Sequence, residues 1–405
     1  MWEDFQQHLW LYLSMPLVAA LIGYVTKLVA IRMMFQPIKF IGIKPFLGWQ
    51  GIIPRRAEKM ASIAADTLTA RLINTRELYN RIDPTEIIKA LEEPLIRDID
   101  IIADEVIGKL QPEIWEALPT LVRDQLIGNM RKEIPGVIKA LMADMDRDLD
   151  SIFDIKSMVV SIMSKDKELL NRIFKEVGKP EFQFIANSGI YFGFLIGLIQ
   201  ASTWMLTHSP LIMPMFGLFT GWFTDWLALK MIFYPKQQTK YMGLVTWQGL
   251  FIKRRQQVAA EYGALIATEI LTPRNILEYV LSGPLSDRLY EMITRIIKKT
   301  IDSQVGFAKP IVIMTLGGEK YQEVKHKAAL KIIERLPETL KNIETYVGNA
   351  LDIKNTIVSK MQQLTEEEFE GVLRPAFQQD EWILITVGAV LGFLVGEMQV
   401  FLMTH

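Results

Sequence analysis

The stretch GYVTKLVAIRMMFQP, from Gly23 to Pro37, recurs as GWFTDWLALKMIFYP, from Gly221 to Pro235, at an offset of 198 residues. The same offset continues outward into polar sequence, where Trp49-Gln50-Gly51 overlays Trp247-Gln248-Gly249 and Asp154-Ile155-Lys156 overlays Asp352-Ile353-Lys354. Chance likeness between apolar helices does not explain matches in polar sequence. The chain is therefore predicted to be a tandem duplication.

Small residues repeat at helical spacing in both copies. Gly23, Thr26, Ala30, Met33 and Pro37 are identical in the second copy and draw one stripe along a helix. Small residues let helices approach closely in lipid. We therefore expect helix packing, within a four-helix bundle or between protomers, at Gly23, Gly221, Gly189, Gly193, Gly197, Gly388, Gly392 and Gly396.

Four apolar stretches are long enough to cross a bilayer, which takes roughly 20 helical residues. They are Leu9–Met34, Phe182–Leu206, Leu211–Phe233 and Trp382–Met403. Only Thr207–Pro210 separates the second from the third, so these two form a tight hairpin and both long connections leave on one side. The first spans of the two halves then run in the same direction. The repeats are predicted to be parallel, related by a pseudo-two-fold axis along the membrane normal.

The predicted fold is an all-α membrane protein with two long amphipathic-helical domains on one side of the membrane. The connections carry apolar residues three and four apart and show no strand alternation of useful length. The expected segments are a first transmembrane helix in 1–36, the helical domain of repeat 1 in 37–181, a second transmembrane helix in 182–206, the short hairpin and third transmembrane helix in 207–235, the helical domain of repeat 2 in 236–380, and a fourth transmembrane helix in 381–405.

Charge is distributed unevenly along a nearly neutral chain. The 45 Lys and Arg residues balance 46 Asp and Glu residues, which gives no argument for nucleic-acid binding. Residues 1–26, 180–229 and 375–405 contain no Lys or Arg, whereas basic residues follow the spans on the loop side. The positive-inside rule then predicts cytoplasmic connections and termini outside. The absence of Cys excludes a disulfide scaffold and a cysteine-ligated metal site.

The repeated motif carries a family resemblance. The pattern G-x-x-T-x-x-x-A-x-x-M-x-F-x-P, followed by W-Q-G and a basic pair, resembles the YheB/YjiN type of bacterial membrane protein over essentially the whole chain. This resemblance implies a multi-pass protein of the bacterial cell (inner) membrane, and it implies no activity. The second copy departs from the first where Asp225 replaces Lys27 and where Ile252 replaces Pro54.

Thr26, Lys27, Thr224 and Asp225 are the candidate polar binding residues inside the bundle. Lys27 and Asp225 occupy equivalent positions near the loop-side ends of their spans. Pairing across the pseudo-two-fold axis is one interpretation, and snorkelling of Lys27 to the interface is the other. The aspartate side chain is shorter and snorkels less well, so we expect Asp225 to face protein or a hydrated cavity and not lipid.

The residues that follow the first spans are candidates for contact with lipid. The segment Ile38–Gly48 is apolar but broken by Gly and Pro, and we expect it at the interface with Phe40, Phe46 and Trp49 at headgroup depth. The basic side chains beyond it either bind anionic headgroups or only mark topology. These headgroup candidates are Arg55, Arg56, Lys253, Arg254 and Arg255.

The sequence shows no arrangement typical of catalysis. His8, His208, His326 and His405 lack partners at metal-ligand spacing, and the phosphate-loop, nucleophile-elbow and dinucleotide motifs do not occur. We therefore expect a non-enzyme without metal or cofactor, acting as an oligomeric membrane scaffold or as a lipid-binding or lipid-transfer protein. Its expected partners are membrane lipids and further copies of itself, with no nucleic acid and no protein partner that the sequence can name.

The alternative is a transporter or channel that uses the polar site in the pseudo-symmetric bundle. A lipid-sized apolar cavity in the helical arms would favour the first function, and polar groups facing a central hydrated path would favour the second.

Overall fold

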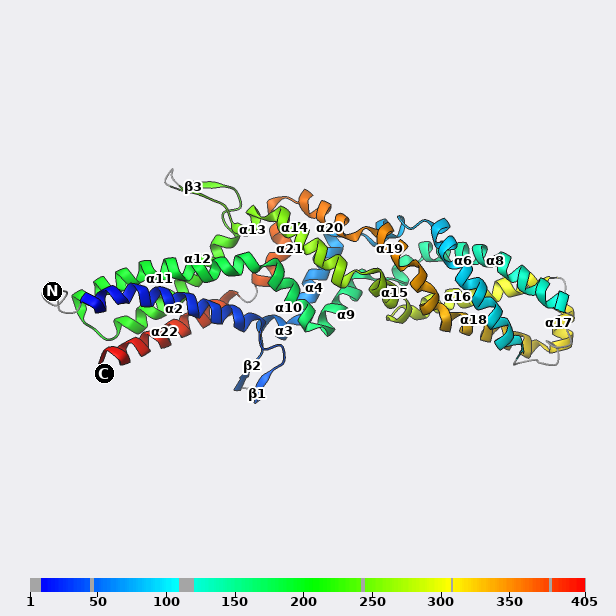
Figure 1. The fold of residues 1–405 in the computed structure, drawn as a ribbon, viewed down its shortest axis with the longest axis horizontal. Helices are drawn as coiled ribbons and strands as arrows, with labels where there is room; N and C mark the ends of the chain where they lie inside the picture. The colour runs from blue at the N-terminus through cyan, green and yellow to red at the C-terminus, as the bar shows by residue number, and fades with distance from the viewer. Residues whose placement is uncertain are drawn as a thin grey trace. The chain divides into compact units, whose positions relative to one another are not determined.

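The computed structural model describes residues 9–43, 47–108, 120–241, 245–306, 309–378 and 381–404, and these are mostly helical. They form two compact units, each built from both halves of the chain. Unit 1 takes residues 1–72, 159–266 and 357–405, and unit 2 takes residues 73–158 and 267–356 (Figure 1). Phe46, His8 and His405, named above, lie outside the described residues.

Four long helices form the bundle of unit 1: α2 (Leu9–Phe35), α11 (Lys179–Thr207), α12 (Ile212–Phe233) and α22 (Glu381–Thr404). Helices α2 and α12 run in one direction and α11 and α22 return, so the α11–α12 turn lies at the same end of the bundle as the start of α2 and the end of α22 (Figure 1). Large apolar side chains such as Leu17, Ile199, Trp222 and Met398 are exposed on the outside of the bundle. A helix that is apolar all round suits a lipid environment.

Three of these helices are long and apolar enough to cross a membrane by length and composition: Tyr12–Phe35, Lys179–Thr207 and Glu381–Phe401. Helix α12, the predicted third span, is not among them. Its 22 residues include Asp225, Lys230 and several Trp and Thr residues, which lower the mean hydropathy of the helix. It nevertheless packs against all three other helices of the bundle.

Glycine determines how closely the bundle helices approach. A Cβ atom added at Gly23 would lie 2.5 Å from the carbonyl oxygen of Gly189, and one at Gly221 would lie 2.1 Å from that of Gly388. Both distances are shorter than any real Cβ contact, so the backbones meet directly. Gly193, Gly197, Gly392 and Gly396 continue the two contacts toward the terminal ends of the helices. The close contacts therefore join α2 to α11 and α12 to α22.

Short elements at the loop-side end of the bundle occur twice, 198 residues apart. The chain passes through a hairpin, β1 (Ile41–Ile43) with β2 (Leu47–Trp49), and again through β3 (Thr239–Tyr241) with β4 (Val245–Trp247). The Gln50 amide donates to the carbonyl oxygen of Ile38, and the Gln248 amide donates to that of Lys236. The hairpins were not predicted, because strands of three residues are too short to show alternation.

The remaining elements of unit 1 are also arranged in matching order. The first half of the chain has α3 (Ile52–Arg55), α4 (Ala57–Thr67), a π-helix (Leu68–Leu72) and α10 (Lys167–Val177). The second has α13 (Leu250–Lys253), α14 (Arg255–Leu265), a π-helix (Ile266–Ile270) and α21 (Glu366–Gln378). Helices α9 (Ile155–Lys165) and α20 (Ile353–Gln363) contain the boundary between the units.

Unit 2 combines helices from both connections, for which the sequence predicted one helical domain in 37–181 and another in 236–380. Its long helices α6 (Pro84–Ile102) and α8 (Thr120–Arg147) come from the first connection, and α16 (Ser286–Val305) and α18 (Gly318–Thr339) from the second. They bury their apolar faces against one another in shared clusters such as Ile102, Val106 and Ala328. An amphipathic helix must bury one face, and here each connection supplies half of one core.

Shorter elements complete unit 2. They are α5 (Thr75–Tyr79), a π-helix (Ala103–Gly108), a 3₁₀ turn (Leu149–Ser151), α15 (Pro273–Ser282), α17 (Lys309–Leu316), a second 3₁₀ turn (Leu340–Ile343) and α19 (Glu344–Leu351).

An ion pair between the half-buried Arg335 and the buried Asp98 joins the two connections in unit 2 and gives a first prediction. Arg335 Nε donates to Asp98 Oδ1 at 2.6 Å, and Thr339 Oγ1 donates to Asp98 Oδ2 at 2.8 Å. Replacing Asp98 by Asn should lower the free energy of unfolding by about 2 kcal/mol, because Arg335 and Thr339 lose a charged acceptor.

The matched control is Asp100→Asn on the same helix, whose ion pair with Arg131 is half exposed. It should cost only about 0.5 kcal/mol. Chemical denaturation that shows equal effects for the two variants would contradict the shared core.

Candidate functional site

The bundle encloses an ion pair between Lys27 of α2 and Asp225 of α12. Lys27 Nζ lies 3.4 Å from Asp225 Oδ1, and only 2 % of Lys27 and 5 % of Asp225 is exposed. Lys27 Nζ also donates to Ser188 Oγ at 2.9 Å and to the carbonyl oxygen of Thr224 at 3.1 Å. All three donors of the ammonium group therefore have acceptors, which a buried charge requires.

The pair lies well inside the bundle. Lys27 and Asp225 each precede the loop-side end of their helix, Phe35 or Phe233, by eight residues, or about 12 Å of helix. The Lys27 side chain does not reach the surface, so the structure does not show the snorkelling that was one of the two interpretations. Its stem turns inward and its ammonium group meets the carboxylate of Asp225, which faces protein.

Glycine makes room for the carboxylate. A Cβ atom added at Gly388 of α22 would lie 1.9 Å from Asp225 Oδ2, so any larger residue there would displace the carboxylate. The helices around the pair are thus built for a charged group at this depth.

Polar side chains also line a small void farther toward the terminal side. Its polar lining consists of Thr26, Thr220, Thr224, Gln200 and Gln399, and its volume is about 20 Å³. Thr26 and Thr224 match at offset 198, and Gln200 and Gln399 match at offset 199. A void of this size holds about one water molecule, since each needs roughly 10–15 Å³.

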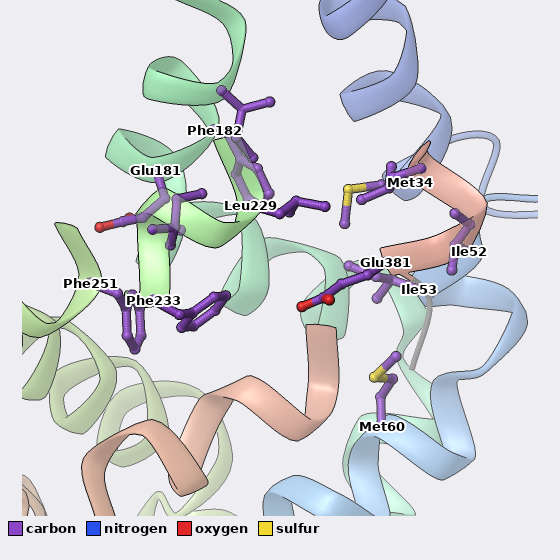
Figure 2. A pocket seen from close by; sticks show the side chains of 14 residues that line it. Met34, Ile52, Ile53, Met60, Glu181, Phe182, Leu229, Phe233, Phe251 and Glu381 are labelled. Atoms are coloured by element: carbon purple, nitrogen blue, oxygen red, sulfur yellow. The ribbon is translucent and has the colours of Figure 1, made fainter. Parts of the chain in front are cut away.

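A second cavity lies at the loop-side end of the four bundle helices, where α3, α4 and α13 cover it (Figure 2). Its volume is about 40 Å³, and its lining is mostly apolar, with Met34, Phe233 and Phe251 among the contributors. Two carboxylates interrupt this lining. Figure 2 shows the carboxylate of Glu381 pointing toward Phe233, whereas that of Glu181 points away from the centre of the cavity.

Glu181 has a fixed partner. Arg254 Nη1 donates to Glu181 Oε1 at 2.7 Å, and Glu181 Oε2 is buried without a hydrogen-bond partner in the described chain. Arg254 also approaches Glu261, at 3.5 Å. It is therefore not free to bind a lipid headgroup.

The other four headgroup candidates differ in exposure. Arg55 and Lys253 are exposed, and Arg56 and Arg255 are half-buried. All four follow the hairpins at the loop side of unit 1.

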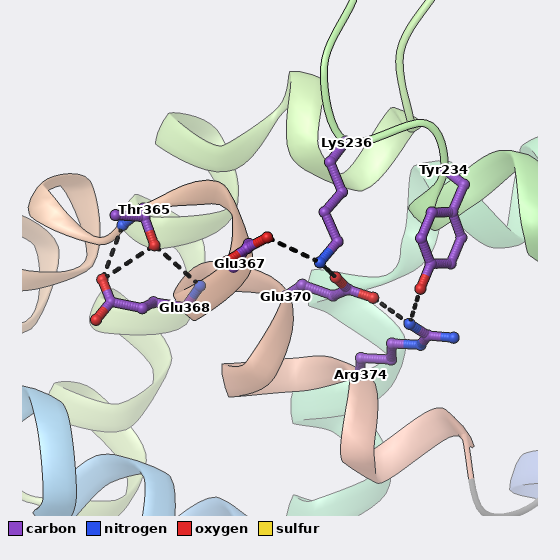
Figure 3. A network of polar contacts seen from close by, with 7 residues as sticks. All are labelled: Tyr234, Lys236, Thr365, Glu367, Glu368, Glu370 and Arg374. Carbon is purple, nitrogen blue, oxygen red and sulfur yellow. Dashed lines mark hydrogen bonds and ion pairs between the residues drawn. The ribbon is translucent and has the colours of Figure 1, made fainter.

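A charged network ties α21 to the loop-side end of α12 (Figure 3). Lys236 Nζ lies 2.9 Å from Glu370 Oε2, and Arg374 donates to both Glu370 and the hydroxyl of Tyr234. Burial alone raises the pKa of Glu370, but the hydrogen bonds from Lys236 and Arg374 outweigh it and hold the pKa below its ordinary value. The network is thus ionised at neutral pH and anchors α21 beside the bundle.

The described residues contain no group of His, Asp and Glu side chains that could hold a metal ion. In unit 2 an open groove lies between α16 and α18, with charged side chains that include Arg295, Lys298, Lys299 and Asp302. It is not a lipid-sized apolar cavity.

Sequence reasoning missed four contributors to the bundle site. Ser188 gives no signal, because serine is common in membrane helices and its match at offset 199 is Val387. Gln200 and Gln399 were visible as a repeated polar pair in apolar spans, and that repetition was the available signal. Glu381 was not identified, because a carboxylate at a span end reads as an interfacial residue.

Comparison with known proteins gives relatives along the full length of the chain. A UPF0754 membrane protein of Nostoc sp. is 23% identical over 97% of this chain and 95% of its own length. Another, from Nostoc punctiforme, is 22% identical over 97% of each chain, and one from Trichodesmium erythraeum is 20% identical over 98% of each. No family model matches the chain. No solved structure matches it.

These names state a membrane location and no activity. They bear out the coarser part of the sequence-based expectation, a family of membrane proteins without an assigned activity, while the resemblance to the YheB/YjiN type stays a prediction. The chain is a distant full-length homologue of the UPF0754 membrane proteins.

Proposed function

We propose that the chain is a tandem duplication whose four bundle helices, α12 included, cross a bacterial cell membrane as two parallel repeats. The repeated hairpins, π-helices and glutamine hydrogen bonds at offset 198 support this reading. Repeat 1 contributes α2 and α11 to the bundle, and repeat 2 contributes α12 and α22.

We further propose that the protein moves a small polar or ionic species across the membrane, the alternative function given above. The observation that carries the proposal is the buried contact between Lys27 Nζ and Asp225 Oδ1 beside a polar void. Charged side chains inside a bilayer are expensive, and they most often mark ion or substrate paths.

The two kinds of helix contact differ in a way that suits transport. Within each repeat, glycine brings the backbones together, at Gly23 with Gly189 and at Gly221 with Gly388. Between the repeats lie the ion pair and the polar void. Each repeat can therefore move as one body, and the polar interface between the repeats is where a path would open.

The ion pair then stabilises the closed conformation. A void for about one water is too narrow for a hydrated ion, so the described conformation is closed. Breaking the contact of Lys27 with Asp225 removes the strongest polar link between α2 and α12. Opening requires that the two charges find other partners, such as water or the transported species.

Reconstituted protein provides the test. Full-length protein in liposomes should pass at least one of H⁺, Na⁺, K⁺ or Cl⁻ faster than protein-free liposomes, and Asp225→Asn should reduce that rate about tenfold or more. The control is Glu397→Gln, which changes an exposed carboxylate on α22. Wild-type protein that passes none of these ions, or an Asp225→Asn variant as fast as wild type, would contradict the proposal.

Lipid binding by an oligomeric scaffold stays a second candidate because one surface favours it. Ile41 and Ile43 of β1 are 66% and 75% exposed at the loop-side end of α2, and Arg55 is exposed nearby in the sequence. An apolar tip next to basic side chains fits the headgroup layer of a bilayer. Replacing Ile41 and Ile43 by Ser should then reduce the lipid that native mass spectrometry finds bound to the protein.

A further inference from the structure

We propose that the species moved through the bundle is the proton, and that Glu381 is its relay on the loop side. This inference rests on the transport function proposed above and adds to it the substrate and a residue outside the ion pair. The observations that carry it are the sizes of the two cavities, the charge beside the inner one, and the place of Glu381 in the outer one.

Size restricts what can pass without large movement. The inner void of about 20 Å³ has room for about one water molecule and none for a hydrated metal ion. A proton needs no space of its own, because it moves along water and polar side chains by exchange of hydrogen bonds. Thr26, Thr224, Gln200 and Gln399 give such side chains on the terminal side of the ion pair.

The charge of Lys27 beside Asp225 also favours the proton over a metal cation. Lys27 lies beside Asp225, so a metal cation that approached the carboxylate would meet an ammonium group 3.4 Å from its ligand. A proton that reaches Asp225 neutralises the carboxylate and leaves Lys27 charged. The contact between the repeats is then weakened by the transported species itself.

Glu381 stands at the loop-side approach to this pair. It begins α22, and Gly388, which Asp225 Oδ2 contacts, follows it by seven residues or about 10 Å of helix. Its carboxylate lies in the cavity of about 40 Å³, which has room for two or three water molecules. No side chain of the described residues donates a hydrogen bond to it.

Among the described residues, the charged groups near Glu381 are Glu181 and Arg374. Glu181 lines the same cavity, is 5 % exposed, and keeps Oε2 without a partner in the described chain. Arg374 of α21 is the cation that acts on Glu381. The rest of the lining is apolar, so water in this cavity has only carboxylate oxygens as strong acceptors.

The transfer balances without a further reactant. Hydronium at the loop side gives its proton to the Glu381 carboxylate and becomes water, with an O–H bond formed on Glu381. That O–H bond breaks when cavity water takes up the proton, which reaches Asp225 once the repeats separate and water enters between this cavity and the ion pair. Glu381 is again a carboxylate. Asp225 is now protonated and no longer forms an ion pair with Lys27.

The test measures proton entry into liposomes that contain the full-length protein and a trapped pH-sensitive dye, driven by a potassium diffusion potential. Wild-type protein should acidify the interior, and Glu381→Gln should slow this about tenfold, the scale on which loss of a positioned acid or base acts. Glu397→Gln, the same change at an exposed position of α22, should leave the rate unchanged. Infrared difference spectra should show a protonated carboxyl signal that Glu381→Gln removes and Glu397→Gln keeps.

The outcomes separate this inference from the proposed function. Asp225→Asn abolishing proton entry while Glu381→Gln does not would overturn the role of Glu381 and leave transport standing. Tracer flux of Na⁺ or K⁺ without proton entry would overturn the proton as substrate. Wild-type liposomes that pass none of the ions would contradict both.

Discussion

Exchanging the two charges, in the double variant Lys27→Asp with Asp225→Lys, should recover about half of the stability that either single variant loses. Each single change leaves two like charges inside the bundle, and breaking a buried pair costs about 3–5 kcal/mol. The double variant restores opposite charges at positions that match at offset 198. The proposed duplication predicts that the exchange is tolerated, since each helix then carries the residue that its counterpart carried.

Full recovery is not expected, because the surroundings of the two charges differ. Lys27 donates to Ser188, whose match is Val387, and Asp225 packs against Gly388. The measurement is thermal or SDS-induced unfolding of the four proteins in detergent, analysed as a double-mutant cycle. A double variant no more stable than the weaker single variant would show that the two side chains do not form a pair.

Enlarging the glycines between α12 and α22 should have an effect of similar size. Gly221→Val places a Cβ 2.1 Å from the carbonyl oxygen of Gly388, so the backbones must separate. Overpacking with side chains costs about 1–3 kcal/mol. Because backbone moves less easily than a side chain, we expect Gly221→Val to lower the free energy of unfolding by about 3 kcal/mol or more. Gly23→Val should act in the same way on α2 and α11, where the Cβ would lie 2.5 Å from Gly189 O.

Gly371→Ala is the matched control, because nothing lies within 4 Å of a Cβ at this exposed position of α21. Alanine has the higher helix propensity, so this change should be neutral or stabilising by up to about 1 kcal/mol. The measurement is the thermal stability of the three variants, Gly221→Val, Gly23→Val and Gly371→Ala, in detergent. Gly221→Val as stable as Gly371→Ala would mean that α12 and α22 are not in direct contact.

The sequence predicted where small and polar residues gather but not which helices they join. Glycine spacing identified Gly189 and Gly388 as packing residues, yet a contact within the chain and a contact between protomers give the same pattern. Likewise, the sequence predicted that Lys27 and Asp225 occupy equivalent positions, but helix rotation and the path of a flexible lysine stem decide whether they meet. Those depend on the packing of all four helices at once.

The long helices of unit 2 were also predictable only in part. Helices such as α6 and α18 have apolar faces that are evident in the sequence, and burial of those faces could be expected. Amphipathicity does not say which helix covers the face. Asp98 pairs with Arg335 from the other connection, over a separation of 237 residues. No local sequence pattern predicts such a partner.

The most direct test of the account is a distance between Lys27 and Asp225 in a lipid bilayer. Protein labelled with ¹⁵N in the lysine side chains and ¹³C in the aspartate carboxyls can be reconstituted and examined by dipolar-recoupling solid-state NMR. We predict a strong coupling between Lys27 Nζ and the Asp225 carboxyl, in keeping with the 3.4 Å contact and absent from the Asp225→Asn variant. A Lys27 signal without this coupling, with an ammonium group that exchanges freely with bulk water, would contradict the buried pair and the transport function built on it.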